Sequence, residues 1–200
     1  MPMNLAHRAL CSSRVWSTLV AKHLPGSLDG VDLGDNVLEI GPGFGATTRV
    51  LVDVVPSLTS IEIDEASVRG LRAEFGERVQ VVHGDGTQLP FPDRSFSAVV
   101  CFAMLHHVPS PALQDRLFAE ARRVLRPGGV FRGVDSRSSL GFRLLHLRDT
   151  MVVVDPATLP DRLTAAGLTG VEVTTAPGQL TFLARAPAWG VSGGSMPGER

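Results

Sequence analysis

Residues 36–50 read NVLEIGPGFGATTRV, and this stretch decides the fold. A short apolar run, Val37 to Ile40, ends abruptly in the glycine-rich turn Gly41 to Gly45, and a helix-like segment follows it. An apolar strand, a tight glycine turn and a helix N-terminus together form the ligand-binding corner of open α/β sheets. Glycine is needed there because the backbone takes positive φ angles and approaches the ligand closely. We therefore expect the first β-α step of a doubly wound sheet, with a nucleotide-like cofactor at the turn.

The turn fits two classes of cofactor. Gly41, Gly43 and Ala46 match the loose G-x-G-x-x-G/A pattern of dinucleotide binding, so an NAD-dependent oxidoreductase stays open as an alternative. Gly45 makes the spacing G-x-G-x-G, and Glu39 places a carboxylate two residues before the first glycine. A carboxylate there repels a pyrophosphate but attracts a ligand that carries positive charge. These two details favour a cofactor without phosphate.

Composition limits the functional classes. The chain has 200 residues, of which 44% are hydrophobic and 20% charged, which suits one globular domain. The net charge of −1 gives no electrostatic case for binding nucleic acid. Two cysteines and no visible histidine cluster predict neither a disulfide framework nor a metal site. We see no signal peptide and no membrane span, so we expect a cytoplasmic protein.

The order of apolar runs and turn signals predicts alternating strands and helices. Residues 5–24 have helical spacing, with Pro25 and Gly26 as the expected stop. Strands are expected at 58–63, 78–83, 95–102 and 130–134, with helices at 46–55, 111–125 and 156–167. Residues 171–175 and 180–184 alternate around a turn and predict a hairpin, and residues 137–149 form a short cover. We divide the chain into an N-terminal helical cap (1–30), one α/β domain (31–187) and a disordered tail (188–200).

Two further acids follow expected strands. Glu62 ends the second strand, near the ~20-residue spacing at which an acid meets ribose hydroxyls. Asp64 is its rival, but Asp64 more simply caps the next helix. Asp85 stands between Gly84 and Gly86 after the third strand, where a carboxylate can accept a hydrogen bond from an adenine amine. A plain Asp-Gly turn is the alternative for this acid.

Four blocks occur in order: VLEIGPGFG, GDGTQLPF, SFSAVVCFAMLHHV and EARRVLRPGGVF. With them, residues from about 37 to 186 resemble a class I S-adenosylmethionine-dependent methyltransferase, most closely the group that acts on small molecules. The resemblance implies an α/β fold with a doubly wound, Rossmann-like sheet of seven mostly parallel strands in three α/β/α layers. In that fold the C-terminal hairpin supplies the antiparallel strand, and the methyltransferase domain spans residues 31–187.

The resemblance also implies a binding site for S-adenosylmethionine, which becomes S-adenosylhomocysteine after methyl transfer. Its residues are Glu39, Gly41, Gly43, Gly45, Glu62, Ile63, Gly84, Asp85, Gly86, Phe102 and Ala103. The first acid and the glycine turn would hold the methionine end, Glu62 the ribose, and the Gly84–Gly86 turn the adenine. The last two residues would border the reactive methyl group.

A general base is needed when the acceptor is a hydroxyl group. His107 is the candidate that the resemblance implies, with His106 as its rival, and either can instead simply pack or cap a turn. We expect a small-molecule acceptor with an O, N or C nucleophile, and neither nucleic acid nor membrane as a partner. A cofactor-binding protein without catalysis is a third hypothesis, because the cover at 137–149 is short. The sequence does not indicate the oligomeric state.

Overall fold

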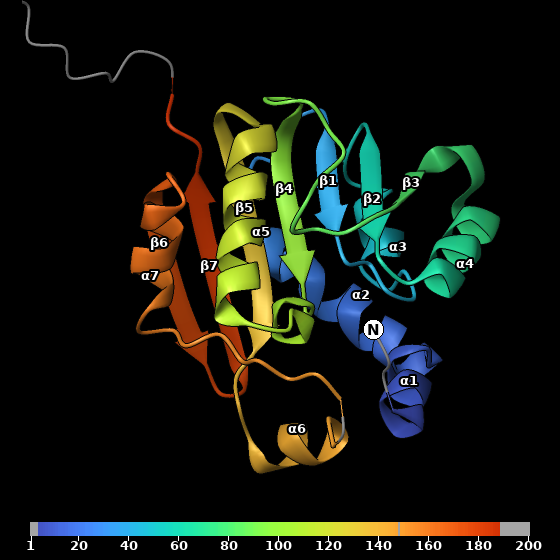
Figure 1. Ribbon diagram of the computed structural model, residues 1–200. Helices are drawn as coiled ribbons and strands as arrows, with labels where there is room; N and C mark the ends of the chain where they lie inside the picture. Colours follow the sequence, from blue (N-terminus) through green and yellow to red (C-terminus); the bar gives the residue numbers. More distant parts are fainter. Residues whose placement is uncertain (1–3, 148, 189–200) are drawn as a thin grey trace, which may run out of the picture.

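The structure, a computed structural model, describes residues 4–147 and 149–188 and contains one seven-stranded sheet (Figure 1). The strand order is β3-β2-β1-β4-β5-β7-β6. The strands are β1 (Val37–Ile40), β2 (Leu58–Glu62), β3 (Gln80–His83), β4 (Phe96–Phe102), β5 (Leu125–Ser136), β6 (Thr169–Ala176) and β7 (Gln179–Arg185). The tail predicted for residues 188–200 lies outside the described residues except for Ala188.

The register aligns the carboxyl ends of five parallel strands. Ile40 of β1 lies opposite Ile61 of β2 and Cys101 of β4, and β3 and β5 continue the parallel pairing outward. Strand β7 inserts between β5 and β6 and is antiparallel to both. This confirms the predicted hairpin as the source of the antiparallel strand, and it confirms the doubly wound, mostly parallel sheet.

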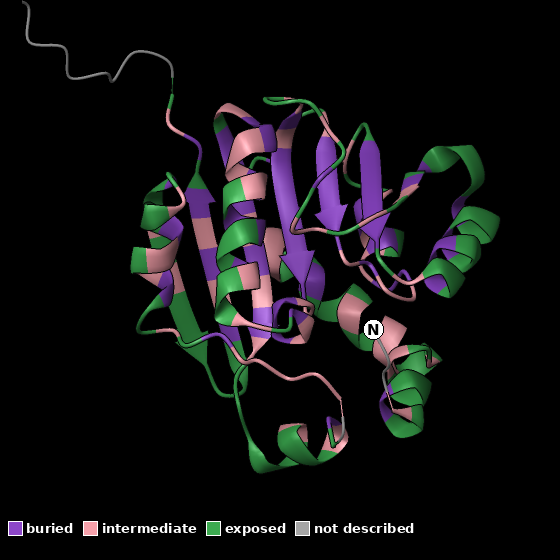
Figure 2. Ribbon diagram, viewed as in Figure 1, coloured by how far each residue is buried: buried purple, intermediate pink, exposed green. Residues whose placement is uncertain are grey.

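Helices cover both faces of the sheet and make the predicted three layers. Helices α5 (Pro111–Val124) and α7 (Leu159–Ala165) share one apolar core with the sheet. Helices α2 (Arg14–Leu28), α3 (Thr48–Leu51) and α4 (Glu65–Phe75) share the other. Successive β4 residues alternate between the two cores, as the two-residue period of a strand requires. The buried strands therefore form the middle layer, purple in Figure 2.

The N-terminal segment differs from the single helix that we predicted. Helix α1 (Leu5–Cys11) ends before Ser13, whose hydroxyl caps α2 by accepting from the Trp16 N–H at 3.1 Å. Pro25 lies inside α2 and does not end it, because only one further helical turn follows and little hydrogen bonding is lost.

Strand and helix lengths also differ after the glycine turn and around Pro127. Helix α3 has one turn, shorter than the predicted helix at 46–55. Strand β5 begins at Leu125, before the predicted start at residue 130, and therefore includes Pro127 and Gly128. A register shift between Phe96 and Ala98 of β4 accommodates this extension, so Pro127 sits at an irregularity in the ladder. Two short 3-10 helices, η1 (Gly76–Arg78) and η2 (Leu105–His107), complete the connections.

Helices α1 and α6 (Leu140–Leu145) lie at the carboxyl edge of the sheet, below the arrowheads of β1 and β4 in Figure 1. Asn4 joins them, because its side chain donates to the Leu145 carbonyl at 2.7 Å and its N–H donates to Asp149 at 2.5 Å. Arg132 of β5 holds α2 by donating to the Ser27 carbonyl. We call α1, α2 and residues 137–149 the cap. Among the described residues, no helix has the length and apolar character to cross a membrane.

The glycine turn uses two of its glycines for different purposes. Gly43 has φ +55°, and a Cβ built there meets nothing within 4 Å. Gly45 has φ +75°, and a Cβ there would come within 2.9 Å of Leu71 and 3.1 Å of Phe75, both on α4. Gly45 thus permits close packing of the turn on α4, whereas Gly43 leaves open space beside the turn.

We expect Gly45→Ala to lower the free energy of unfolding by about 2–4 kcal/mol, because it adds left-handed backbone strain to an overlap with Leu71. Chemical denaturation measures this change. Gly26→Ala is the control: Gly26 lies exposed in α2 with nothing near its Cβ, so alanine should stabilise by about 0.5–1 kcal/mol. Equal effects of the two substitutions would contradict the packing role of Gly45.

Candidate active site

A cavity of about 1200 Å³ opens at the carboxyl edge of the sheet. Its walls come from the turns after β1 to β5 and from the cap. Eleven of the thirteen residues predicted for the site line it, namely Gly41, Gly43, Glu62, Ile63, Gly84, Asp85, Gly86, Phe102, Ala103, His106 and His107. Glu39 and Gly45 do not.

Glu39 lies behind the cavity wall, on the face of the sheet that α3 covers. It is 1% exposed and accepts hydrogen bonds from Thr48 and Ser60 at 2.7 Å each, and from Thr47. Burial raises the pKa of the Glu39 carboxyl, and the hydroxyl hydrogen bonds oppose that shift. The direct contact with the methionine end that we expected does not fit this position. Glu39 instead ties the start of α3 to β1 and β2 and so holds the glycine turn.

Glu62 reaches the cavity and also contacts the turn. Its Oε2 accepts from the Gly43 N–H and its Oε1 from the Asp64 N–H, both at 2.9 Å. Each oxygen keeps a lone pair for a ligand, as a ribose diol requires. Asp64 caps α4 by accepting from the Ser67 N–H at 2.8 Å, and this bond lowers the pKa of its carboxyl. The local use predicted for Asp64 is therefore confirmed.

Asp85 combines the two interpretations that the sequence left open. Its Oδ1 accepts from the Thr87 N–H at 2.8 Å and closes an Asx turn. The residue is nevertheless exposed and lines the cavity, so its second oxygen remains available to a hydrogen-bond donor.

His106 forms a buried pair with Asp135 at the end of β5. The Nδ1 atom of His106 lies 2.5 Å from Oδ1 of Asp135, and the His106 N–H donates to Oδ2 at 3.0 Å. Both residues line the cavity, and they are 2% and 3% exposed. The carboxylate favours a proton on Nδ1, which leaves Nε2 as an acceptor. The sequence analysis did not identify Asp135, which directly follows the expected strand at 130–134, although an acid at the end of an expected strand was the signal that identified Glu62.

His107 stands among other histidines. Its pKa is lowered to about 3, chiefly by burial and then by His106, His7 and His146. At neutral pH its imidazole is therefore uncharged. His7 comes from α1 and His146 follows α6, and both line the cavity. No local pattern marked either residue, because their partners are far away in the sequence.

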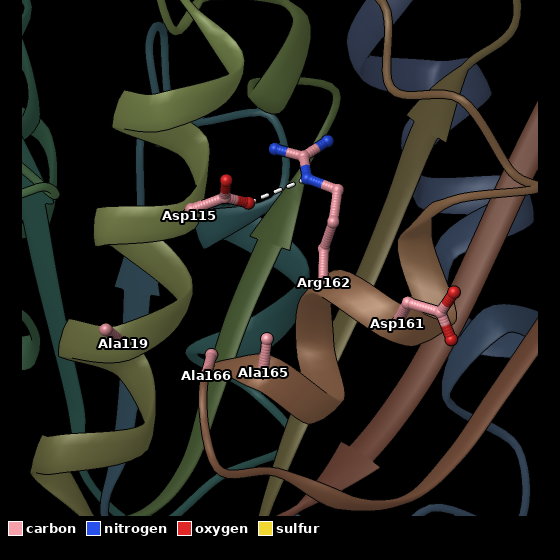
Figure 3. A pocket seen from close by; sticks show the side chains of 6 residues that line it. All are labelled: Asp115, Ala119, Asp161, Arg162, Ala165 and Ala166. Atoms are coloured by element: carbon pink, nitrogen blue, oxygen red, sulfur yellow. Dashed lines mark hydrogen bonds and ion pairs between the residues drawn. The ribbon is translucent and has the colours of Figure 1, made fainter.

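A second hollow of about 400 Å³ lies between α5 and α7 (Figure 3). There Arg162 extends toward Asp115, with the two charged groups 2.7 Å apart, whereas Asp161 points away from both. Arg162 also donates to Gln114 and to the Pro111 carbonyl. Its donors serve to hold the two helices together, so we place the functional site in the larger cavity.

Fold and site together define an α/β protein with a cavity at the carboxyl edge of a Rossmann-like sheet, and the residues that line this cavity suit a nucleoside-type cofactor. Residues 38–132 match the family described as "Methyltransferase domain". Residues 38–132 therefore match a class I S-adenosylmethionine-dependent methyltransferase domain, and S-adenosylmethionine is the cofactor of that class. The match favours S-adenosylmethionine over the dinucleotide, the alternative suggested by Gly41, Gly43 and Ala46.

Several known proteins are similar to this chain. A probable S-adenosylmethionine-dependent methyltransferase of Mycolicibacterium smegmatis is 40% identical over 49% of this chain. The 27-O-demethylrifamycin SV methyltransferase of Amycolatopsis mediterranei is 34% identical over 48%, and ribosomal RNA small subunit methyltransferase A of Chlorobaculum parvum is 35% identical over 50%. The matches cover 37%, 36% and 36% of these relatives, so the chain matches little more than a third of their length.

A solved structure supports the fold across nearly the whole chain. The PH0226 protein of Pyrococcus horikoshii superposes with a TM-score of 0.74 at 17% identity, over 88% of this chain and 93% of that one. This likeness concerns the fold alone.

The residues of the cavity fit the cofactor. The open space beside Gly43 admits a ligand against the bare backbone, and Glu62 and Asp85 present oxygens from two different strand ends. Ile63 adds an apolar surface that is 46% exposed, suited to a flat base. These three features come from the turns after β1, β2 and β3 and line the same cavity.

We expect Glu39→Gln to lower the free energy of unfolding by about 2–4 kcal/mol. An uncharged amide weakens the acceptor for three hydroxyl donors and places an N–H group among them. Urea denaturation gives the change. Glu77→Gln, an exposed site on η1, should stay within about 0.5 kcal/mol of the unchanged protein. A Glu39 variant as stable as the control would refute the anchoring role.

Proposed function

We propose that this protein transfers the methyl group of S-adenosylmethionine to an O, N or C nucleophile of a small molecule. The observation that carries the proposal is the capped cavity. Its volume exceeds the upper end of the ~300–1000 Å³ range of single-ligand pockets, so it can hold the cofactor and an acceptor together. The cap adds walls to the cavity, which favours an acceptor that fits inside.

The cap gives the acceptor region an apolar wall. Leu10, Trp16, Leu19, Phe142 and Leu145 line it, which suits an apolar or aromatic acceptor. An acidic acceptor would need cationic side chains in the cavity wall, but Arg14, Arg137 and Arg143 do not line the cavity, and Arg148 lies outside the described residues. Arg8 does line it, but its guanidinium stacks over Phe44 at 5.6 Å.

The bound cofactor supplies a methyl group already activated on sulfonium. The protein's own contribution is then alignment, with the nucleophile held ~3–3.5 Å from the methyl carbon. Phe102 ends β4 and Ala103 follows it, and both line the cavity where the methyl group would lie. Ala103 adopts φ +52°, and its N–H donates to the Val134 carbonyl at 2.7 Å. That bond fixes the bend of the chain where the acceptor must approach.

For a hydroxyl acceptor, His106 is a better candidate for the general base than His107. Asp135 orients the His106 ring and leaves Nε2 to accept the proton. His107 has a strongly lowered pKa and is therefore a poor proton acceptor near neutral pH. We therefore propose His106 as the general base in place of His107.

Two other functions compete with this proposal. One relative is a ribosomal RNA methyltransferase, but a net charge of −1 and the capped cavity do not favour RNA as the acceptor. A protein that binds the cofactor without catalysis is the other, and turnover with any acceptor excludes it. The cytoplasmic location expected from the sequence stays a prediction.

We expect S-adenosylhomocysteine, but not NAD, to bind with measurable heat in isothermal calorimetry. Replacing both Glu62 and Asp85 with alanine should weaken that binding by at least about 100-fold, since each carboxylate accepts hydrogen bonds worth about 1.5–3 kcal/mol. Glu65→Ala on α4 is the matched control, because Glu65 is exposed and pairs with Arg69. Undiminished affinity in the double variant would overturn the proposed cofactor site.

We expect His106→Gln to lower kcat by about 10²–10⁴-fold with a hydroxyl acceptor, while affinity for S-adenosylhomocysteine stays within about threefold. Asp135→Asn should also reduce kcat, because the ring loses its orientation. Release of S-adenosylhomocysteine across a panel of acceptors provides the assay, and Lys22→Gln is the control, because Lys22 is exposed on α2 and does not line the cavity. A His106 variant with unchanged kcat would exclude it as the base.

A further inference from the structure

Three histidines from distant parts of the chain meet on the cavity wall. His7 lies on α1, His107 in η2 and His146 at the C-cap of α6. One ring nitrogen of each lies within 4.8 Å of one nitrogen of each of the others. We call these three residues the histidine cluster. It joins the two halves of the cap to the end of β4.

Each of the three histidines already has one hydrogen-bond partner outside the cluster. Nδ1 of His7 lies 2.8 Å from Oδ2 of Asp149, and Nδ1 of His146 lies 2.8 Å from the Phe142 carbonyl oxygen. His107 has a backbone hydrogen bond with Thr150. Histidines that bind metals have this arrangement, in which a carboxylate or carbonyl orients the ring and the second nitrogen faces the ion.

The second nitrogen of His146 has no partner. His146 is 4% exposed, and among the described residues its Nε2 is the buried side-chain polar atom without a hydrogen bond. Because Nδ1 donates to a carbonyl, Nε2 carries a lone pair, and a buried lone pair without a partner is costly. A cation between the three rings would satisfy it. Simple ring stacking, with His7 and His107 centroids 5.2 Å apart, would leave it unsatisfied.

We infer that His7, His107 and His146 bind a divalent transition-metal ion of the zinc type, with Nε2 of His7 and of His146 as two of the three ligand atoms. Three imidazoles suit zinc, copper, nickel or iron and not magnesium or calcium. A tetrahedral zinc ion with Zn–N bonds of about 2.0–2.1 Å holds its nitrogens about 3.3–3.4 Å apart. The cluster nitrogens, now within 4.8 Å of one another, would have to move closer by side-chain rotation when the ion binds.

The site leaves one coordination position open. Three protein ligands with a free fourth position are the arrangement of catalytic zinc sites, whereas structural sites are closed. All three histidines line the cavity, so the free position faces its interior. A donor atom of the acceptor can occupy this position, and that role rests on the proposed function. Metal binding by the three histidines does not depend on the proposed function.

The full chain, purified and stripped with a chelator, tests the site without cofactor or acceptor. We expect calorimetry to give one zinc ion per chain and a melting temperature that rises until one equivalent is bound. Cobalt should give the intense visible absorption of a tetrahedral nitrogen site. Weak binding, or an octahedral cobalt spectrum, would overturn the inference in the unaltered protein.

Substitutions locate the ion. His7→Gln, His107→Gln and His146→Gln should each weaken zinc binding by more than about 100-fold, and Asp149→Asn, which removes the outer partner of His7, by about 10–100-fold. His23→Gln is the control, because His23 lines the same cavity outside the cluster and should bind zinc as tightly as the unaltered protein. Circular dichroism checks that each variant is folded. Equal zinc affinity in the control and the three variants would overturn the site, whatever the outcome of the methyl-transfer assays.

Discussion

Two carboxylates hold the glycine turn after β1, and the cavity takes its shape from them. Glu39 accepts hydrogen bonds from three hydroxyl groups behind the turn, and Glu62 accepts a hydrogen bond from the Gly43 N–H. A buried carboxylate is costly unless its oxygens are satisfied, so these groups specify one backbone path. That path exposes bare backbone to the cavity and brings the ends of β1 and β2 together. The chemistry of the site therefore begins with a structural constraint on the glycine turn.

The part of the fold that depends on local pattern was predictable. Apolar runs, glycine turns and the alternating hairpin identified all seven strands, because each signal lies within a few residues. The breaks at Ser13 and Pro127 were not predicted. The capping hydroxyl of Ser13 and the register shift beside β5 depend on contacts that propensity does not contain.

The candidate site divides in the same way. Residues at strand ends, such as Glu62 and Asp85, could be placed from the sequence because parallel strands bring their carboxyl ends to one edge. The alternation of side chains across a strand also explains Glu39, which shares a run with Leu38 and Ile40 but lies on the opposite face. His7 and His146 could not be placed from the sequence. The cap brings them to His107 from segments that are far apart in the chain, and no local sequence pattern relates those segments.

Strand β7 has a consequence for the order in which the molecule forms. It fills the position between β5 and β6, and its residues come about fifty positions after those of β5 with which they pair. During synthesis β5 therefore presents unpaired N–H and C=O groups along one side until Arg185 has left the ribosome. For that interval the nascent chain has an unpaired strand edge that can form hydrogen bonds with a strand of another chain. Chaperone protection is most useful to it then.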